Sequence, residues 1–206
     1  MTLFKYLKET LINTMKNVYL IGLILFLGTS AFSQSITNGD MESWPAGCPY
    51  NTAPDSWVNF TVGSSSLGPD QAGSCYGSTP AYEGDSYMNL VYTGSAEEGA
   101  EYTLSGLTIG VEYTITFHAR NSDGIYASSG SGSIDVFHQG SVIYTTPELI
   151  SPGSWAEYTA NFTAATSTDN IAFRIVPGTG SSGSLGIDAV SISGGSSADV
   201  EDNDMI

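Results

Sequence analysis

The chain has few basic side chains and only two cysteines. Five lysine and arginine residues stand against 21 aspartates and glutamates. The three lysines all lie within the first 16 positions, so beyond residue 33 only Arg120 and Arg174 oppose 20 acidic side chains, a formal net charge of −18. Such a surface repels phosphate backbones and anionic lipids, which excludes nucleic acid and direct membrane binding by this part of the chain. Neutral ligands and divalent cations are compatible with it.

Long apolar runs are scarce, and the one near the N-terminus is too short to cross a membrane. It covers residues 18–27, whereas a membrane-spanning helix needs roughly 20 apolar residues. Lysines precede it, and Ala31-Phe32-Ser33 follows in the pattern of a signal-peptide cleavage site. We therefore expect residues 1–33 to be an export signal and the mature protein to be secreted or held at the cell surface. A permanent membrane anchor is the alternative.

The two cysteines, Cys48 and Cys75, both lie in the part of the chain expected to be exported. An even number of cysteines in an oxidising compartment favours a disulfide, and two cysteines allow only one intramolecular pairing. We therefore predict that they are bonded to each other, with two free buried thiols as the alternative.

Residues 34–193 lack a sustained apolar period of 3.6 residues and alternate with a period of two instead. Over residues 111–120 the apolar side chains of Tyr113, Ile115 and Phe117 share one side, and the polar side chains share the other. The alternation recurs at residues 132–139, 156–164, 170–176 and 187–193, with turn signals between these segments. The pattern predicts an all-β domain, an antiparallel β-sandwich of eight to ten strands.

Glycine- and serine-rich stretches interrupt this pattern. Residues 63–80 and 126–133 contain few apolar side chains and are predicted to be loops, where binding sites of β-sandwiches often lie. Residues 194–206 combine small and acidic side chains, so we expect a flexible acidic tail or linker after the domain.

Several segments, taken in order, resemble carbohydrate-binding modules of families 4 and 9. They are ITNGDMESW at 36–44, APDSW at 53–57, AYEGDSYMNL at 81–90, LSGLTIGVEYTITFHAR at 104–120, SWAEYTANFTA at 154–164 and IDAVSI at 187–192. The resemblance implies the galactose-binding-like jelly-roll fold and a sugar-binding, non-catalytic function. The final residues, DVEDNDMI, are similar to the segment that precedes a type IX secretion sorting domain, and an ordinary acidic tail is the alternative.

Acidic side chains near both ends of the domain are candidates for a cation site. Alternation places Asp188 on the side of Val190 and Ile192, which we expect to face the core, and places Asp40 and Glu42 together on one side of an early strand. Unpaired buried carboxylates are costly, and calcium accepts carboxylate and backbone oxygens. The resemblance assigns a structural calcium first to Glu42 and Asp188, then to Asp40, Glu83 and Gly84. Solvated carboxylates at strand ends are the alternative.

The polar side of residues 111–120 is the candidate ligand surface. Sugars present apolar ring faces edged by hydroxyls, which exposed aromatic rings and planar hydrogen-bonding groups recognise. His118 and Arg120, next to Asn121, supply such polar groups, and Tyr126 and Trp155 are the aromatic candidates. Packing is the alternative role for Trp155, and pairing with a carboxylate is the alternative for Arg120.

Together these features predict a secreted, non-catalytic carbohydrate-binding module that is stabilised by calcium and binds an oligo- or polysaccharide. Neither His118 nor His138 lies in a recognisable metal or nucleophile motif. Two alternatives stay open. One is a surface protein that uses the same sandwich for contacts with other cell-surface proteins. The other is the N-terminal binding part of a larger secreted glycoside hydrolase.

Overall fold

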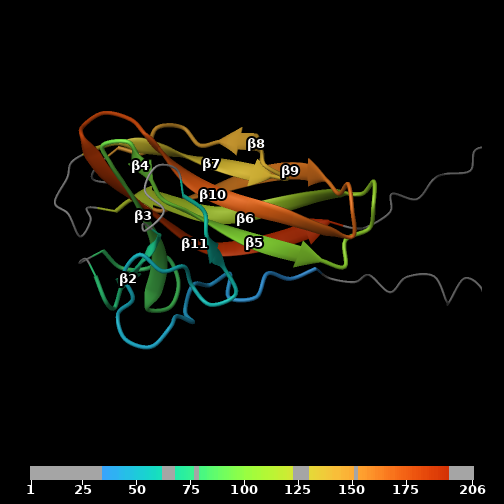
Figure 1. Cartoon of the computed structure of the whole chain (residues 1–206), viewed down its shortest axis with the longest axis horizontal. Coiled ribbons are helices and arrows are strands. Elements are labelled where there is room, and N and C mark those ends of the chain that lie inside the picture. The colour runs from blue at the N-terminus through green and yellow to red at the C-terminus, as the bar shows by residue number, and fades with distance from the viewer. Residues whose placement is uncertain (1–33, 62–67, 77–78, 123–129, 151–152, 195–206) are drawn as a thin grey trace, which may run out of the picture. The chain divides into compact units, whose positions relative to one another are not determined.

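The computed structural model describes residues 34–61, 68–76, 79–122, 130–150 and 153–194. The predicted export signal, Tyr126 and the acidic tail lie outside these residues. Within them the chain forms eleven strands in two antiparallel sheets and no helix (Figure 1). None of the described residues therefore belongs to a helix that could cross a membrane. The prediction of an all-β antiparallel sandwich is confirmed.

The first sheet, sheet A, has the strand order β1-β5-β10-β7-β8. Its strands are β1 (Val58–Asn59), β5 (Gly99–Ser105), β10 (Thr168–Pro177), β7 (Gly132–His138) and β8 (Ser141–Thr145). The second, sheet B, has the order β2-β3-β11-β6-β9, and the short β4 (Ala96–Glu97) pairs with β3. Its strands are β2 (Asp70–Gly73), β3 (Ser86–Thr93), β11 (Ser182–Gly194), β6 (Glu112–Asn121) and β9 (Ala156–Thr163).

Alternating apolar side chains fill the space between the sheets. In β6 the predicted core residues Tyr113, Ile115 and Phe117 are at most 3% exposed, and burying each such side chain stabilises the fold by about 1.5 to 3 kcal/mol. Phe117 meets Phe173 of β10 edge to face, with 5.0 Å between ring centroids, which joins the two sheets. Trp57 packs against the same Phe173 and is 5% exposed, so it is a core residue.

The alternation breaks in β11. The register of β11 against β6 shifts between Asp188 and Ser191, and Ala189 has a left-handed φ of 50°, so a β-bulge lies here. Because the extra residue reverses the alternation, Ile187 and Val190 both pack in the core while Asp188 points to the other side of sheet B. The prediction that Asp188 shares the side of Val190 is therefore wrong.

Two further segments differ from the sequence prediction. Residues 36–42 contain no strand; residues 37–41 form turns, with φ of 55° at both Asn38 and Met41, so Asp40 and Glu42 do not share one side of a strand. Part of the predicted loop 63–80 is β2, whose residues Asp70 and Ala72 pair with β3. Its mixed polar and small side chains gave no apolar alternation to recognise.

Cys48 and Cys75 form a disulfide, as predicted, with 5.3 Å between their Cα atoms. The bond closes the irregular segment that leads into β2. Within this segment the Asn51 backbone N–H donates to the Asp70 carboxylate at 2.8 Å. The disulfide and this hydrogen bond together hold the segment against sheet B.

We predict that replacing both cysteines, Cys48→Ala with Cys75→Ala, lowers the free energy of unfolding by about 3 kcal/mol, because a loop of this length is no longer closed in the unfolded chain. Urea denaturation of the variant and of the oxidised wild type measures the difference. Reduced wild-type protein is the control and should lose a similar amount. Equal stability of all three proteins would contradict the prediction.

Candidate functional site

The side of sheet B that faces away from sheet A carries polar side chains, and we call it the outer face. Asp70 of β2 pairs with Asn89 of β3, Asn89 pairs with Gly186 of β11, and Gly186 pairs with Arg120 of β6. These residues alternate with core residues of the same strands. They therefore form one row across four strands.

An aromatic cluster covers one end of the outer face. The rings of Tyr82 and His118 stack, with centroids 3.5 Å apart and planes 15° apart. Trp155 meets Tyr82 edge-on at 6.3 Å, and its indole N–H donates to the Pro80 carbonyl at 3.0 Å. The Arg120 guanidinium lies 5.8 Å from the centre of the Trp155 ring. We call Tyr82, His118, Arg120 and Trp155 the aromatic platform.

The middle of the row is built for close packing of aromatic rings. Gly186 has no side chain, and a Cβ there would lie 2.8 Å from the Tyr87 ring and 2.9 Å from the Trp155 ring. Both rings therefore lie directly on the strand, and they meet edge to face with centroids 5.3 Å apart. Because Tyr87 is only 1% exposed, this contact is buried between the polar residues of the row.

Arg120 and Asn121 are both predicted ligand residues and are adjacent in the sequence, but they lie on opposite sides of β6. Arg120 faces outward, and among the described residues no carboxylate forms an ion pair with it; its Nε donates to the Asn121 carbonyl at 3.1 Å. Asn121 is 1% exposed and its amide donates to the carbonyls of Gly130 and Leu149. The expectation that Asn121 belongs to the ligand surface is wrong, because it alternates with Arg120 and holds two loops.

The turn that carries Tyr82 is held by two carboxylates. Asp188 Oδ2 accepts the backbone N–H groups of Tyr82 at 2.9 Å and Glu83 at 3.2 Å. Glu42 Oε1 accepts two further backbone N–H groups, those of Asp85 and Ser86, each at 2.8 Å. Burial raises the pKa of Asp188 to about 7, although its three backbone hydrogen bonds oppose this rise.

Two of the residues predicted to bind calcium, Glu42 and Asp188, thus both contact the turn that contains Glu83 and Gly84. The side chains of Asp40 and Glu83 are exposed, and the described part of the chain contains no group of three or more His, Cys, Asp or Glu side chains that could hold a metal ion. Calcium also accepts backbone carbonyls and water, so two carboxylates are compatible with a site completed by such ligands. Calcium binding here stays a prediction.

Buried polar side chains gather at the other end of the row, and all are at most 3% exposed: Asp70, Asn89, Glu98, Ser122 and Ser184. Asn89 Oδ1 accepts hydrogen bonds from the hydroxyls of Ser122 at 2.6 Å and Ser184 at 2.7 Å. Glu98 accepts the Val91 backbone N–H at 2.7 Å. We call these five residues the buried polar patch.

Burial shifts the acids of this patch strongly. It raises the pKa of Asp70 to about 6, against the opposing hydrogen bond from the Asn51 N–H. It raises the pKa of Glu98 to about 9, against the opposing Val91 N–H, and the charge of Asp70 adds to the rise. Glu98 is therefore protonated at neutral pH, whereas Asp70 is mostly ionised.

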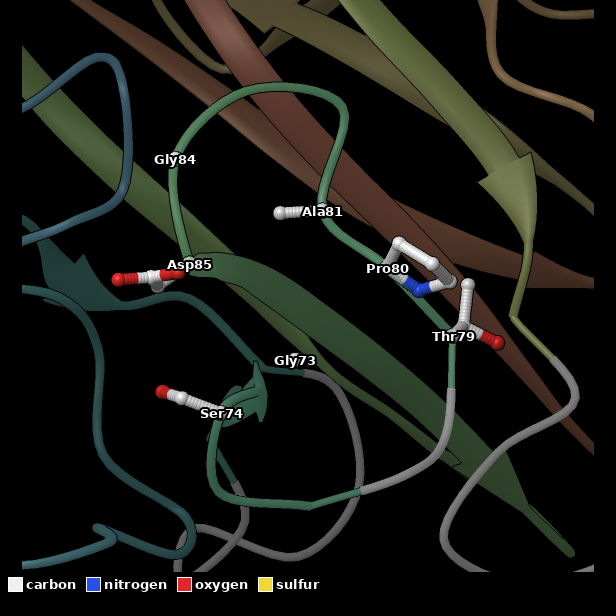
Figure 2. Close-up of a pocket in the computed structure, with 7 residues that line it drawn as sticks. All are labelled: Gly73, Ser74, Thr79, Pro80, Ala81, Gly84 and Asp85. Atoms are coloured by element: carbon white, nitrogen blue, oxygen red, sulfur yellow. The ribbon is translucent and has the colours of Figure 1, made fainter.

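A pocket of about 290 Å³ lies between the end of β2 and the segment that carries Tyr82 (Figure 2). Its polar lining includes Ser74, Thr79 and Asp85, and Figure 2 shows the side chains of Ser74 and Asp85 extending to the same side. Pro80 and Ala81 complete the wall next to Tyr82. The pocket therefore adjoins the aromatic platform.

Sequence reasoning identified three platform residues and missed Tyr82, Asp70 and Asn89. An aromatic residue inside a polar, glycine-containing turn, as in AYEGD, is a signal that could have identified Tyr82. Asp70 and Asn89 lie on strands whose outward positions mix polar and apolar side chains, so no pattern marked them. Tyr126 lies outside the described residues.

We predict that stability falls as pH rises, because the folded protein binds more protons than the unfolded chain, whose carboxyls titrate near pH 4. The raised pKa values of Asp70 and Glu98 place this fall between about pH 4 and pH 9. The Glu98→Gln variant should lose the part of this fall in stability that occurs above pH 7. The Asp70→Asn variant should keep that part. Urea denaturation at pH 5, 7 and 9 measures these slopes. Equal slopes above pH 7 for wild type and Glu98→Gln would contradict the assignment.

Comparison with family models and with curated proteins gives no match. Solved structures match over most of the described chain. A cyclase from Fischerella sp. TAU, in complex with 4-(1H-indol-3-yl)butan-2-one, has a TM-score of 0.55 and 21% identity over 80% of this chain and 98% of that one. The K2 cleaved adhesin domain of Lys-gingipain has a TM-score of 0.54 and 14% identity over 80% and 99%.

Sugar-binding proteins are also among the similar structures. The C-terminal domain of EclA, a sugar-binding protein, matches with a TM-score of 0.39 and 23% identity over 45% of this chain, and the chain spans 64% of the length of that domain. Carbohydrate-binding modules of families 4, 22 and 61 match as well. The cyclase and the adhesin domain, whose TM-scores exceed 0.5, share the β-sandwich fold with this chain.

Proposed function

We propose that this protein is an exported carbohydrate-binding domain whose ligand lies on the outer face of sheet B. The observation that carries the proposal is the stack of Tyr82 on His118. Tyr82 is 46% exposed although one face of its ring is covered by His118. The exposed face offers a stacking surface to the apolar face of a sugar ring.

The platform is rigid enough to bind without large ordering costs. Asp188 fixes the backbone of Tyr82, His118 supports its ring, and Trp155 is tied to Pro80. Side chains that are ordered before a ligand arrives lose less entropy on binding, so more of the contact energy contributes to affinity.

Arg120 is the platform residue that would form hydrogen bonds to the ligand. Its guanidinium forms no ion pair with a carboxylate among the described residues, and its Nε–H donates to the Asn121 carbonyl, so its terminal NH₂ groups are the ones available to ligand oxygens. Hydrogen bonds from a charged donor are stronger than neutral ones. The net charge of −18 beyond residue 33 disfavours acidic glycans and leaves neutral ones as the best-fitting class.

The compartment follows from the disulfide and the N-terminal segment. Disulfides such as Cys48–Cys75 persist in oxidising surroundings and are rare in reducing ones. Residues 1–33 have the composition of an export signal. Both features support a location outside the cell or at its surface.

Calcium is part of the proposal, with Glu42 and Asp188 as its side-chain ligands. A bound ion would tie the turn 82–86 to β11 and to the segment before Trp44. In this role it would support the platform from below without touching the sugar, because both carboxylates contact the backbone of the turn and not the exposed Tyr82 ring.

We predict that calcium raises the melting temperature relative to chelator, because an ion that binds only the folded state stabilises it. The double variant Glu42→Ala with Asp188→Ala should lose this rise. Glu101→Gln, an acidic residue of sheet A, is the control and should retain it. Identical melting curves of the wild type in calcium and in chelator would remove calcium from the proposal.

We predict that the wild type binds a neutral oligosaccharide and that Arg120→Ala weakens binding by about 1.5 to 3 kcal/mol, the range of a lost charged hydrogen bond. Tyr82→Ala should weaken it by about 1 kcal/mol or more through lost apolar contact. Isothermal titration with cellopentaose, laminaripentaose, xylopentaose and mannopentaose measures this, with melting curves in parallel.

The matched control is Val142→Ala, which removes an exposed apolar side chain from sheet A and should leave the affinity unchanged. If Arg120→Ala lowers the melting temperature and leaves the affinity intact, Arg120 is structural. If the wild type binds none of the four sugars, the sandwich is better explained as a surface for protein contacts.

A further inference from the structure

The pocket between the end of β2 and the segment 79–85 presents two polar side chains to solvent. Ser74 and Asp85 both line it, both are exposed, and both extend to the same side (Figure 2). Their backbones are tied together, because the Ser74 N–H donates to the Asp85 carbonyl at 2.8 Å. The Asp85 N–H in turn donates to Glu42 Oε1 at 2.8 Å. The backbone that carries the two side chains is therefore fixed before any ligand arrives.

A short chain of hydrogen bonds leaves the hydroxyl proton of Ser74 free for a ligand. The Gln71 amide donates to Ser86 Oγ at 2.9 Å, and Ser86 Oγ lies 3.1 Å from Ser74 Oγ. Ser86 is only 2% exposed, and a buried hydroxyl group normally donates its own proton as well as accepting one. Because Ser86 accepts from Gln71, its proton goes to Ser74 Oγ. Ser74 then accepts from Ser86 and can turn its own proton toward the pocket.

Asp85 supplies the acceptors of the pocket. Its carboxylate forms no ion pair within the part of the chain that the structure describes. A carboxylate accepts hydrogen bonds at two oxygens, so two neighbouring hydroxyl groups of one sugar ring can each donate to one of them. The charge of Asp85 and the net charge of −18 beyond residue 33 disfavour an anionic ligand.

The size and the walls of the pocket fit one sugar ring. Its volume of about 290 Å³ lies near the lower limit of the range for small-molecule sites, about 300 to 1,000 Å³. Pro80 and Ala81 form an apolar wall, which the hydrogen bond from the Trp155 indole to the Pro80 carbonyl holds in place. On the β2 side, Gly73 has a φ of 88°, and a Cβ there would lie 2.4 Å from the Asp85 carbonyl oxygen, so a side chain is excluded. An apolar wall next to hydroxyl-binding groups matches the apolar face and polar edge of a sugar.

We propose that this pocket is a second sugar site, which binds one neutral sugar unit through two neighbouring hydroxyl groups. Asp85 accepts hydrogen bonds from these two hydroxyls, Ser74 donates to a further oxygen, and the apolar wall contacts a face of the ring. Tyr82 does not line the pocket, and its ring stacks on His118, so the pocket can be filled without the aromatic platform. The inference rests on the proposed function and adds a second site for the same class of ligand.

Titration of the mature protein with single sugars, followed by its backbone amide NMR signals, tests the pocket. The probes are the methyl glycosides of glucose, galactose, mannose and xylose, and at least one should shift the Ser74 and Asp85 signals saturably. Asp85→Asn should weaken this binding by about tenfold or more, because an acceptor with a charge becomes a neutral donor. Ser74→Ala should weaken it by about threefold or more.

Glu101→Gln is the matched control, since it makes the same change in net charge on sheet A and should keep the wild-type affinity. Melting curves accompany the titrations, and Asp85→Asn should be as stable as the wild type, because the exposed carboxylate holds no part of the fold. Should that variant fail to fold, Ser74→Ala serves the same comparison. Equal affinity of the wild type and Asp85→Asn overturns the second site.

The outcomes separate the second site from the proposed function. If a pentaose binds at the platform and no glycoside shifts the Ser74 and Asp85 signals, the second site is overturned and the function stands. If a glycoside binds in the pocket and Arg120→Ala leaves pentaose binding intact, the second site stands and the platform assignment falls. The absence of any shift with glycosides and pentaoses overturns both.

Two charged sugars test the ligand class. Glucosamine that binds much more tightly than glucose would make the pocket a cation site and overturn the neutral class. Glucuronate that binds as tightly as glucose would overturn it as well. The expected order is a neutral sugar bound at least as tightly as glucosamine, and glucuronate bound most weakly.

Discussion

The arrangement of the outer face depends on the contact between Asp188 and the turn that carries Tyr82. The bulge at Ala189 turns Asp188 away from the core, and its carboxylate then accepts the backbone N–H groups of Tyr82 and Glu83. Only with the turn held there can the Tyr82 ring stack on His118 of the neighbouring strand. A backbone irregularity in the last strand thus determines where an aromatic ring about a hundred residues earlier is presented.

The two sides of sheet B follow different rules of packing. Its core side is filled mainly by apolar side chains such as Ile115 and Ile187, although it also contains Asn121, whose Oδ1 has no hydrogen-bond partner among the described residues. Its outer side contains Asp70 and Asn89, fully buried and each with an unpartnered atom. Natural proteins violate local rules of this kind mainly at functional sites, where stability is given up for pre-arranged groups. Unpartnered atoms occur on both sides, however, so the exposed Tyr82 ring, and not these buried atoms, supports the outer side as the proposed ligand face.

The sequence alone correctly predicted the features that depend on regular strand alternation or on a single possible cysteine pairing. The inward side of β6 and the bond between Cys48 and Cys75 are examples, because a strand period of two and a single possible pairing leave little choice. It failed where one residue reverses the alternation, as at Ala189, and where polar side chains form a strand, as in β2. A bulge depends on the register of two strands, and register is a property of tertiary structure that one segment does not encode.

Only two arginines lie beyond residue 33, and their surroundings differ. Arg174 lies between the carboxylates of Glu97 and Asp135 and over the Phe137 ring on sheet A, so its charge is used in holding the fold. Arg120 has no such partner among the described residues and stands beside Trp155. In a domain so acidic, a guanidinium left without a carboxylate is unexpected on electrostatic grounds, since attraction alone would favour pairing. Its isolation next to Trp155 on the aromatic platform supports the proposal that Arg120 contacts a bound sugar.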